Sequence, residues 1–185
     1  MPADPTLVAR DVADRVLSAP PTLGTGRLVC VDGPAGSGKT TLADALGATS
    51  DDAVVIHCDE LLLGWGGLPG LAATVETLLT PLAEGRPSRW TRWDWLADDW
   101  AESHLVEPGG LLVLEGVGSW SPAIAHLVGM LVWVEADLGL RLDRGMARDG
   151  EAMREHWVRW QVEERELHTT HRTRDHADLV VSTDG

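Results

Sequence analysis

Eight residues from Gly33 to Thr40 have the types and spacing needed to bind a phosphate group. Two glycines stand five positions apart and are followed directly by Lys39 and Thr40, which is the pattern of a phosphate-binding loop. Glycines let successive backbone N–H groups turn toward an anion, because no Cβ lies in the way. We expect the lysine ammonium to reach the β- and γ-phosphates of a nucleotide, and the threonine hydroxyl to hold Mg²⁺.

The residues around this loop match the structural context that the motif requires. An apolar run at 28–31 is typical of a strand, and a helix-compatible run follows at 41–46. A helix that starts at the loop also directs its positive end toward the bound anion. The residues expected to bind the nucleotide are Gly33, Ala35, Gly36, Ser37, Gly38, Lys39, Thr40 and Thr41.

Lysine usage supports the same interpretation. Of fifteen basic residues, Lys39 is the only lysine, and the others are arginines. A lysine ammonium is a compact point charge that suits a phosphate. The chain therefore places its single lysine at the position where this chemistry needs one.

Three acidic residues each follow a predicted strand. In a parallel sheet flanked by helices, ligands bind at the carboxyl ends of the strands. Asp59 suits the orientation of an acceptor hydroxyl, and Glu115 suits a hydrated Mg²⁺. For Glu135 the simpler interpretation is a helix cap or a solvent-facing carboxylate. A kinase site built on Asp59, Thr40 and Glu115 is the hypothesis.

The elements that must position these residues alternate along the chain. Alternation of strands and helices predicts an α/β three-layer sandwich with a mostly parallel sheet. Asp4 and Pro5 are suited to begin an additional N-terminal helix over about 5–18. A Gly-rich stretch at 61–70 is interpreted as a mobile loop. The expected strands are 27–32, 53–58, 111–114, 130–134 and 177–182, and the later helices 71–84, 137–148 and 151–167.

Three arginines fall on one face of the predicted helix 137–148. Arg141, Arg144 and Arg148 are spaced so that they could close over a triphosphate and neutralise the charge that develops during transfer. The alternative is an ordinary solvated helix face. If the arginines close over a triphosphate, the segment 141–160 forms a lid. The catalytic residues are then Lys39, Asp59, Arg141, Arg144 and Arg148.

Tryptophan is the only aromatic residue apart from histidine. The chain has nine tryptophans and no Phe or Tyr, and four of the nine lie between 90 and 100. Trp93 and Trp95 would share one face of a short strand, with Asp94 on the other. The tryptophans then either form core and wall or offer a stacking platform to a planar substrate. The candidate substrate residues are Asp59, Trp65, Trp93, Asp94 and Trp95.

Composition limits the classes of partner. A length of 185 residues indicates one domain spanning 1–185. A net charge of −14 argues against nucleic acid or an anionic membrane. No apolar run is long enough to span a membrane and the N-terminus lacks a signal-peptide pattern, so a cytoplasmic protein is expected. Cys30 and Cys58 are expected to be buried thiols, and the spacing of His168, His171 and His176 does not favour a metal site. The oligomeric state stays open.

These motifs, in this order, resemble the uridine kinase-like branch of the phosphate-loop kinases. The motifs are the loop at 33–41, Cys58-Asp59-Glu60, Trp93-Asp94-Trp95, Leu114-Glu115-Gly116, Arg141 to Asp149, and 177–180. The resemblance implies a five-stranded parallel sheet, ATP or GTP with Mg²⁺, and transfer to a hydroxyl. It also implies that Asp59 activates the acceptor and that the arginines form the lid. The chain departs from the family at Glu60-Leu61, and at 67–70, where the ribose-binding carboxylate is missing.

The expected function is ATP- and Mg²⁺-dependent phosphoryl transfer to a hydroxyl of a small molecule, with a nucleoside as one candidate. One alternative is a nucleoside-monophosphate kinase, for which Arg86, Arg89 and Arg92 could bind the extra phosphate. Another is a nucleotide-binding regulator with little turnover. A regulatory GTPase is disfavoured, because guanine recognition there usually uses an Asn-Lys-x-Asp segment, and the chain has no Asn and no second Lys.

Overall fold

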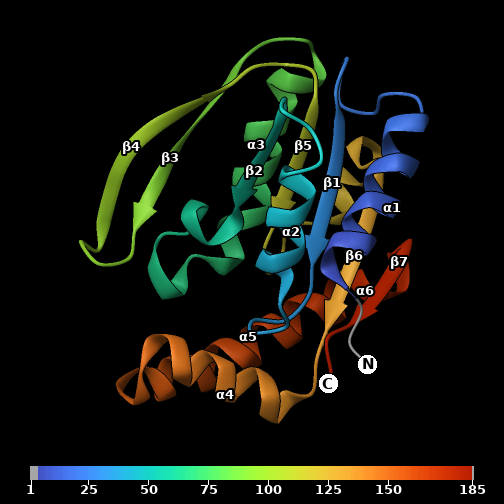
Figure 1. Ribbon diagram of the computed structural model, residues 1–185. Coiled ribbons are helices and arrows are strands. Elements are labelled where there is room, and N and C mark those ends of the chain that lie inside the picture. Colours follow the sequence, from blue (N-terminus) through green and yellow to red (C-terminus); the bar gives the residue numbers. More distant parts are fainter. Residues whose placement is uncertain (1–3, 185) are drawn as a thin grey trace.

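A five-stranded sheet forms the centre of the structure, a computed structural model that describes residues 4–184 (Figure 1). Its order is β2-β5-β1-β6-β7, and all four pairings are parallel. The inner strands are continuous apolar runs buried on both faces, as expected for a parallel sheet. This confirms the predicted fold class. The strands are β1 (Arg27–Asp32), β2 (Ala53–His57), β5 (Leu111–Glu115), β6 (Met130–Glu135) and β7 (Leu179–Ser182).

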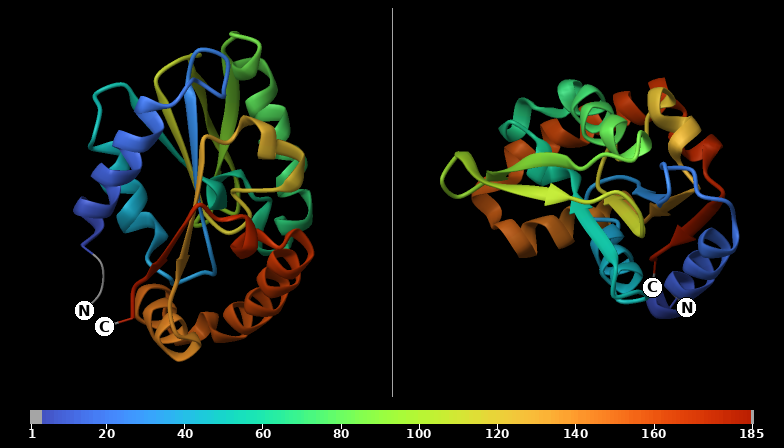
Figure 2. Two further views of the ribbon diagram at one scale, coloured as in Figure 1. Left: turned by 90° about the vertical axis from the view of Figure 1, so that its right-hand side faces the viewer. Right: turned by 90° about the horizontal axis from the view of Figure 1, so that it is seen from above.

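Helices cover both faces of this sheet and complete three layers. Helices α1 (Pro5–Ser18) and α2 (Lys39–Gly47) lie on one face, and α3 (Leu71–Ala83) lies on the other with the end of α5 (Arg154–His171) (Figure 2). Successive residues of β1 point to opposite faces. Val29 and Val31 pack with α1 and α2, whereas Leu28 and Cys30 pack with α3.

The N-terminal helix has the cap that its sequence predicts. The Asp4 carboxylate accepts a hydrogen bond from the Thr6 amide at 2.9 Å, and Pro5 is the first helical residue. Ala9, Val12 and Val16 are buried on the helix face that meets the sheet. The extra helix is therefore part of the core.

The segment at 61–70 differs from the mobile loop that its glycines suggest. It is built from short 3-10 turns, namely η1 (Cys58–Leu61), η2 (Gly64–Gly66) and η3 (Leu68–Gly70). Leu61, Leu62 and Leu68 are buried in the core beside α3. These leucines anchor the segment to the core, and short 3-10 turns stand where a mobile loop was expected.

An antiparallel hairpin stands apart from the sheet, next to the β2 edge (Figure 1). It consists of β3 (Ser88–Asp94) and β4 (Asp99–Val106), and its register shifts between Thr91 and Trp93. The short strand at Trp93 was expected, but β4 was not. Trp95 lies in the turn after β3, so the prediction that Trp93 and Trp95 share a strand face was wrong.

Two helices cross the carboxyl ends of the strands (Figure 1). Helix α4 (Leu138–Asp149) is capped by Asp137, whose carboxylate accepts from the amides of Gly139 and Leu140. The turn η5 (Glu151–Met153) leads from α4 into α5. The single helix predicted over 151–167 is thus a 3-10 turn followed by an α-helix that starts at Arg154. The predicted lid thus lies over the edge where the phosphate loop is. The remaining elements are η4 (Pro122–Leu127) and α6 (Thr173–His176).

None of the helices within residues 4–184 has the length and apolar character needed to cross a membrane.

Candidate active site

The phosphate loop connects β1 to α2, and its backbone has the shape of an anion cradle. Gly36 has φ +77°, and a Cβ there would lie 2.6 Å from the carbonyl oxygen of Arg141. Gly38 caps α2 with φ +92°. Among residues 4–184 the amides of Gly36 and Gly38 have no backbone acceptor. These free donors, at the positive end of a helix, fit a bound phosphate.

Lys39 is held beside this cradle. Its ammonium donates to the carbonyl oxygen of Pro34 at 3.0 Å, and the residue is only 6% exposed. A buried ammonium with one protein acceptor retains two N–H donors. Lys39 is therefore placed to serve the phosphates, as the motif predicts.

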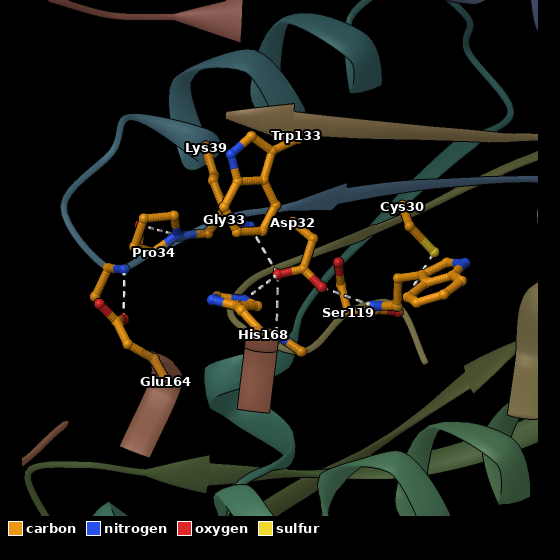
Figure 3. A network of polar contacts seen from close by, with 12 residues as sticks. Cys30, Asp32, Gly33, Pro34, Lys39, Ser119, Trp133, Glu164 and His168 are labelled. Atoms are coloured by element: carbon orange, nitrogen blue, oxygen red, sulfur yellow. Dashed lines mark hydrogen bonds and ion pairs between the residues drawn. The ribbon is translucent and has the colours of Figure 1, made fainter. Parts of the chain in front are cut away.

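A buried carboxylate fixes the start of the loop (Figure 3). Asp32 is fully buried at the end of β1, and it accepts from the Gly33 amide at 2.7 Å. It also accepts from the amides of Gly118 and Trp120, and it pairs with His168 Nε2 at 3.0 Å. One side chain thus joins three segments, including α5. Asp32 was not among the predicted site residues, because in the sequence it is only the last residue of an apolar strand.

A second carboxylate supports the loop from α5. Glu164 accepts from the Ala35 amide at 2.7 Å (Figure 3). It also accepts from the Arg141 guanidinium at 2.8 Å. Arg141 also donates to the Ala35 carbonyl at 3.2 Å. Both side chains are buried. Arg141 was expected to close over a triphosphate, but its guanidinium is already engaged beneath the loop, so we assign it a positioning role.

The other two arginines of α4 face the cleft. Arg144 donates to the carbonyl of Gly36 at 3.2 Å and to the Thr183 hydroxyl at 3.0 Å. Arg148 pairs with Asp149 and lies over the Trp157 ring at 5.7 Å from its centre. Both arginines line the main cavity. They are therefore placed where the predicted lid needs positive charge.

Three polar residues meet where a hydrated magnesium ion is expected. The Thr40 hydroxyl lies 3.3 Å from a Glu115 carboxylate oxygen, and the same oxygen lies 2.7 Å from His57 Nδ1. The hydrogen bond to Glu115 raises the pKa of His57 to about 9. A hydroxyl beside a carboxylate is a donor set that suits Mg²⁺. When bound, the ion would neutralise phosphate charge; Thr40 and Glu115 would hold it, and His57 would orient Glu115.

Asp59 lies at the end of β2, in η1, and faces the same cavity. Burial raises the pKa of its carboxyl, as does the Glu115 charge, while His57 and Arg148 act in the opposite direction. Its neighbour Glu60 also lines the cavity, and burial likewise raises its pKa. Asp59 is thus a carboxylate open to the cleft and adjacent to the expected metal position.

The main cavity has a volume of about 1290 Å³ and runs from the phosphate loop to the hairpin. Trp65 meets Trp95 edge-on at 5.4 Å between ring centres, and Trp160 at 5.8 Å. The indole of Trp95 donates to the carbonyl of Asp59 at 3.2 Å. The tryptophans along the wall are Trp65, Trp93, Trp95, Trp157 and Trp160. Trp93 and Trp157 are nearly buried and still line the cavity, which fits a role in core and wall, while a stacking platform for a planar substrate stays a prediction.

Two predicted positions lie elsewhere. Asp94 does not line the cavity; its carboxylate accepts from the amides of Leu96 and Ala97 and therefore shapes the hairpin turn. Glu135 binds Arg174 and the Trp133 indole, in agreement with a structural role.

Several residues of the site were not anticipated from the sequence. They are Asp32, His57, Glu60, Trp157, Trp160 and Glu164. The only available signals were that His57 and Glu60 flank the Cys58-Asp59 motif, and that Trp157 and Trp160 are spaced as one helix face.

Comparison with known proteins supports the fold. No protein-family model and no functionally described protein matches the sequence. Among solved structures, a candidate fructose transport system kinase from Silicibacter sp. TM1040 matches with a TM-score of 0.66 at 17% identity, over 96% of this chain and 98% of the other. A candidate uridine kinase from Bacillus stearothermophilus matches with a TM-score of 0.63 at 17% identity, over 94% and 97%. The chain therefore shares the fold of these two solved structures.

Proposed function

We propose that the protein transfers the γ-phosphoryl group of ATP, with Mg²⁺, to a hydroxyl of a small molecule. The observation that carries this proposal is the convergence of the loop, the Thr40–Glu115 pair and Asp59 on one cavity. A phosphoryl transferase needs these three parts close together. The kinase descriptions of the two structural neighbours support the same reaction class.

In this proposal the acceptor oxygen forms a bond to the γ-phosphorus while the bond from phosphorus to the β–γ bridging oxygen breaks. Asp59 accepts the proton of the attacking hydroxyl and later releases it to solvent. Lys39, Arg144 and Arg148 neutralise the charge on the transferred group. ADP and a phosphate monoester leave the site.

The charge of the cavity favours an unphosphorylated acceptor over a nucleoside monophosphate. Arg86 pairs with Glu84 on the surface, and Arg89 is exposed. Arg92 reaches the cavity, but its charge is already balanced by Glu102 and Asp94. An incoming phosphate would also meet Asp59 and Glu60. The unphosphorylated alcohol is therefore the better candidate.

The direct test is the Asp59→Asn variant. It should bind ATP as the native protein does and lose transfer by about 10²–10⁴-fold, the usual contribution of a general base. Calorimetry with ATP and Mg²⁺ measures the first property, and ADP release across a panel of alcohols measures the second. Asp51→Asn, at an exposed position outside the cavity, is the matched control. Undiminished turnover by the Asp59 variant would reject the role.

A further inference from the structure

We propose that the acceptor alcohol carries an organic cation, bound at the hairpin end of the cavity by the Asp59 and Glu60 carboxylates and a tryptophan face. This inference rests on the proposed function and adds the chemical class of the acceptor. The hairpin end is defined here by Asp59, Glu60, Trp65, Trp93 and Trp95, which all line the cavity.

The first observation is that the two carboxylates are uncompensated. Within residues 4–184 no side chain donates a hydrogen bond to the carboxylate of Asp59 or Glu60, and the pKa of each is raised by burial. Glu60 is partly buried, and a partly buried carboxylate without a partner is unfavourable, whereas Asp59 is exposed to the open cavity. A cation supplied by the ligand would remove that penalty.

The second observation is that nearby positive charge is already used. His57 is bound to Glu115 at 2.7 Å, and Arg92 is bound to Glu102 at 2.8 Å and to Asp94 at 3.2 Å. The charge of His57 lowers the pKa of Asp59 and Glu60, and that of Arg92 lowers the pKa of Glu60, but neither cation donates a hydrogen bond to these two carboxylates. Carboxylates outnumber cations at the hairpin end, which favours a cationic ligand there.

The third observation is the aromatic wall. Trp95 is 37% exposed at the cavity rim, and its indole N–H is tied to the Asp59 carbonyl, which fixes the ring beside that residue. Tryptophan is the aromatic side chain that binds cations most strongly over its face. The wall also offers apolar surface to a planar or hydrocarbon body.

The fourth observation is the separation of charge along the cavity. Lys39 and Arg144 contact the phosphate loop, whereas Glu60 lies within the field of Arg92 and His104 of the hairpin, and Asp59 lies between the two. A cationic alcohol would orient itself in this field with the charge at the hairpin and the hydroxyl beside Asp59. The phosphate groups of ATP would occupy the opposite end.

The experiment uses two alcohols of equal shape. Benzyl(2-hydroxyethyl)dimethylammonium and 3,3-dimethyl-4-phenylbutan-1-ol differ by one quaternary nitrogen in place of carbon. Calorimetry with the full chain should show that the cation binds about 5- to 30-fold tighter. Its kcat/KM for ADP release should exceed that of the neutral alcohol by a similar factor. Equal or tighter binding of the neutral alcohol would overturn the inference.

Variants locate the effect. Glu60→Gln should remove most of the preference for the cation, while Glu76→Gln, an exposed glutamate of α3 outside the cavity, should retain it. Trp95→Leu should weaken binding of the cation more than Trp95→Phe does. A preference that survives both Glu60→Gln and Trp95→Leu would place the cation elsewhere and reject this site.

The outcomes separate the two proposals. Binding of ATP without transfer to any alcohol of the panel would reject the kinase function. Transfer to neutral alcohols with no preference for the cation would leave the kinase function intact and reject only the cationic acceptor. Tight binding of the cation without its phosphorylation, while neutral alcohols react, would also reject it as the acceptor.

Discussion

At the phosphate-loop end of the cleft each cationic side chain already has a protein acceptor, whereas at the hairpin end no side chain among residues 4–184 donates a hydrogen bond to the carboxylate of Asp59 or Glu60. Lys39 donates to Pro34 and Arg144 to Gly36, while Arg148 pairs with Asp149. The phosphate end is thus held in place by contacts within the protein. With the proposed cationic acceptor, the hairpin end would receive its partner from the ligand and would be the end that selects the acceptor.

Replacing Lys39 is the strongest way to test this division. Lys39→Met should lower phosphoryl transfer by about 10³-fold, because it removes a preorganised donor to the transferred group. Binding of the quaternary ammonium alcohol should remain, since the hairpin end is untouched. Transfer assays and calorimetry on the same sample measure both, with the exposed Arg10→Met as control. Loss of alcohol binding as well would show that the two ends are not independent.

Because Glu164 of α5 supports the phosphate loop, replacing it should lower the stability of the protein. Glu164→Gln leaves the buried Arg141 charge without its partner, and removal of one partner from such a pair costs about 3 kcal/mol of unfolding free energy. The glutamine oxygen can still accept from the Ala35 amide, so the cost should be near that value rather than above it. Urea unfolding measures the change, with the exposed neighbour Glu163→Gln as control. Equal stability of both variants would contradict a supporting role.

The smallest expected effect concerns the boundary between the two ends. Protonated His57, whose pKa is held at about 9 by Glu115, lowers the pKa of Asp59. Removing that positive charge in His57→Gln should raise the Asp59 pKa, so activity should be lost at a higher pH when the solution is acidified. The pH profile of kcat/KM measures the shift. The exposed His126→Gln should leave the profile unchanged, and a shift to lower pH in His57→Gln would contradict the interaction.

The phosphate end was more predictable from the sequence than the hairpin end. The loop, its strand and its helix are contiguous, and the backbone chemistry depends on glycines that the sequence displays directly. Asp59 and Glu115 could be proposed because each follows an apolar strand. The parallel sheet followed from the alternation of elements.

The hairpin and the supporting carboxylates could not be predicted for physical reasons. Strand β4 is exposed along most of its length, so it lacks the alternation that identifies a half-buried strand. Glu164 stands among Glu163, Arg165 and Glu166, and only tertiary packing distinguishes it as the buried member. Arg141 and Arg144 lie about one turn apart on the same helix, so the sequence does not distinguish them. The Arg141 guanidinium lies under the loop, whereas the Arg144 guanidinium faces the cleft.

Asp32 connects the phosphate loop to a helix near the end of the chain. Its carboxylate joins the first amide of the phosphate loop to His168 of α5, a residue 136 positions away in the chain. The same carboxylate accepts from the amides of Gly118 and Trp120, so α5, the phosphate loop and the segment after β5 meet at one buried side chain. A substitution at His168 is therefore expected to reach the loop through Asp32, although the two residues are far apart in the sequence.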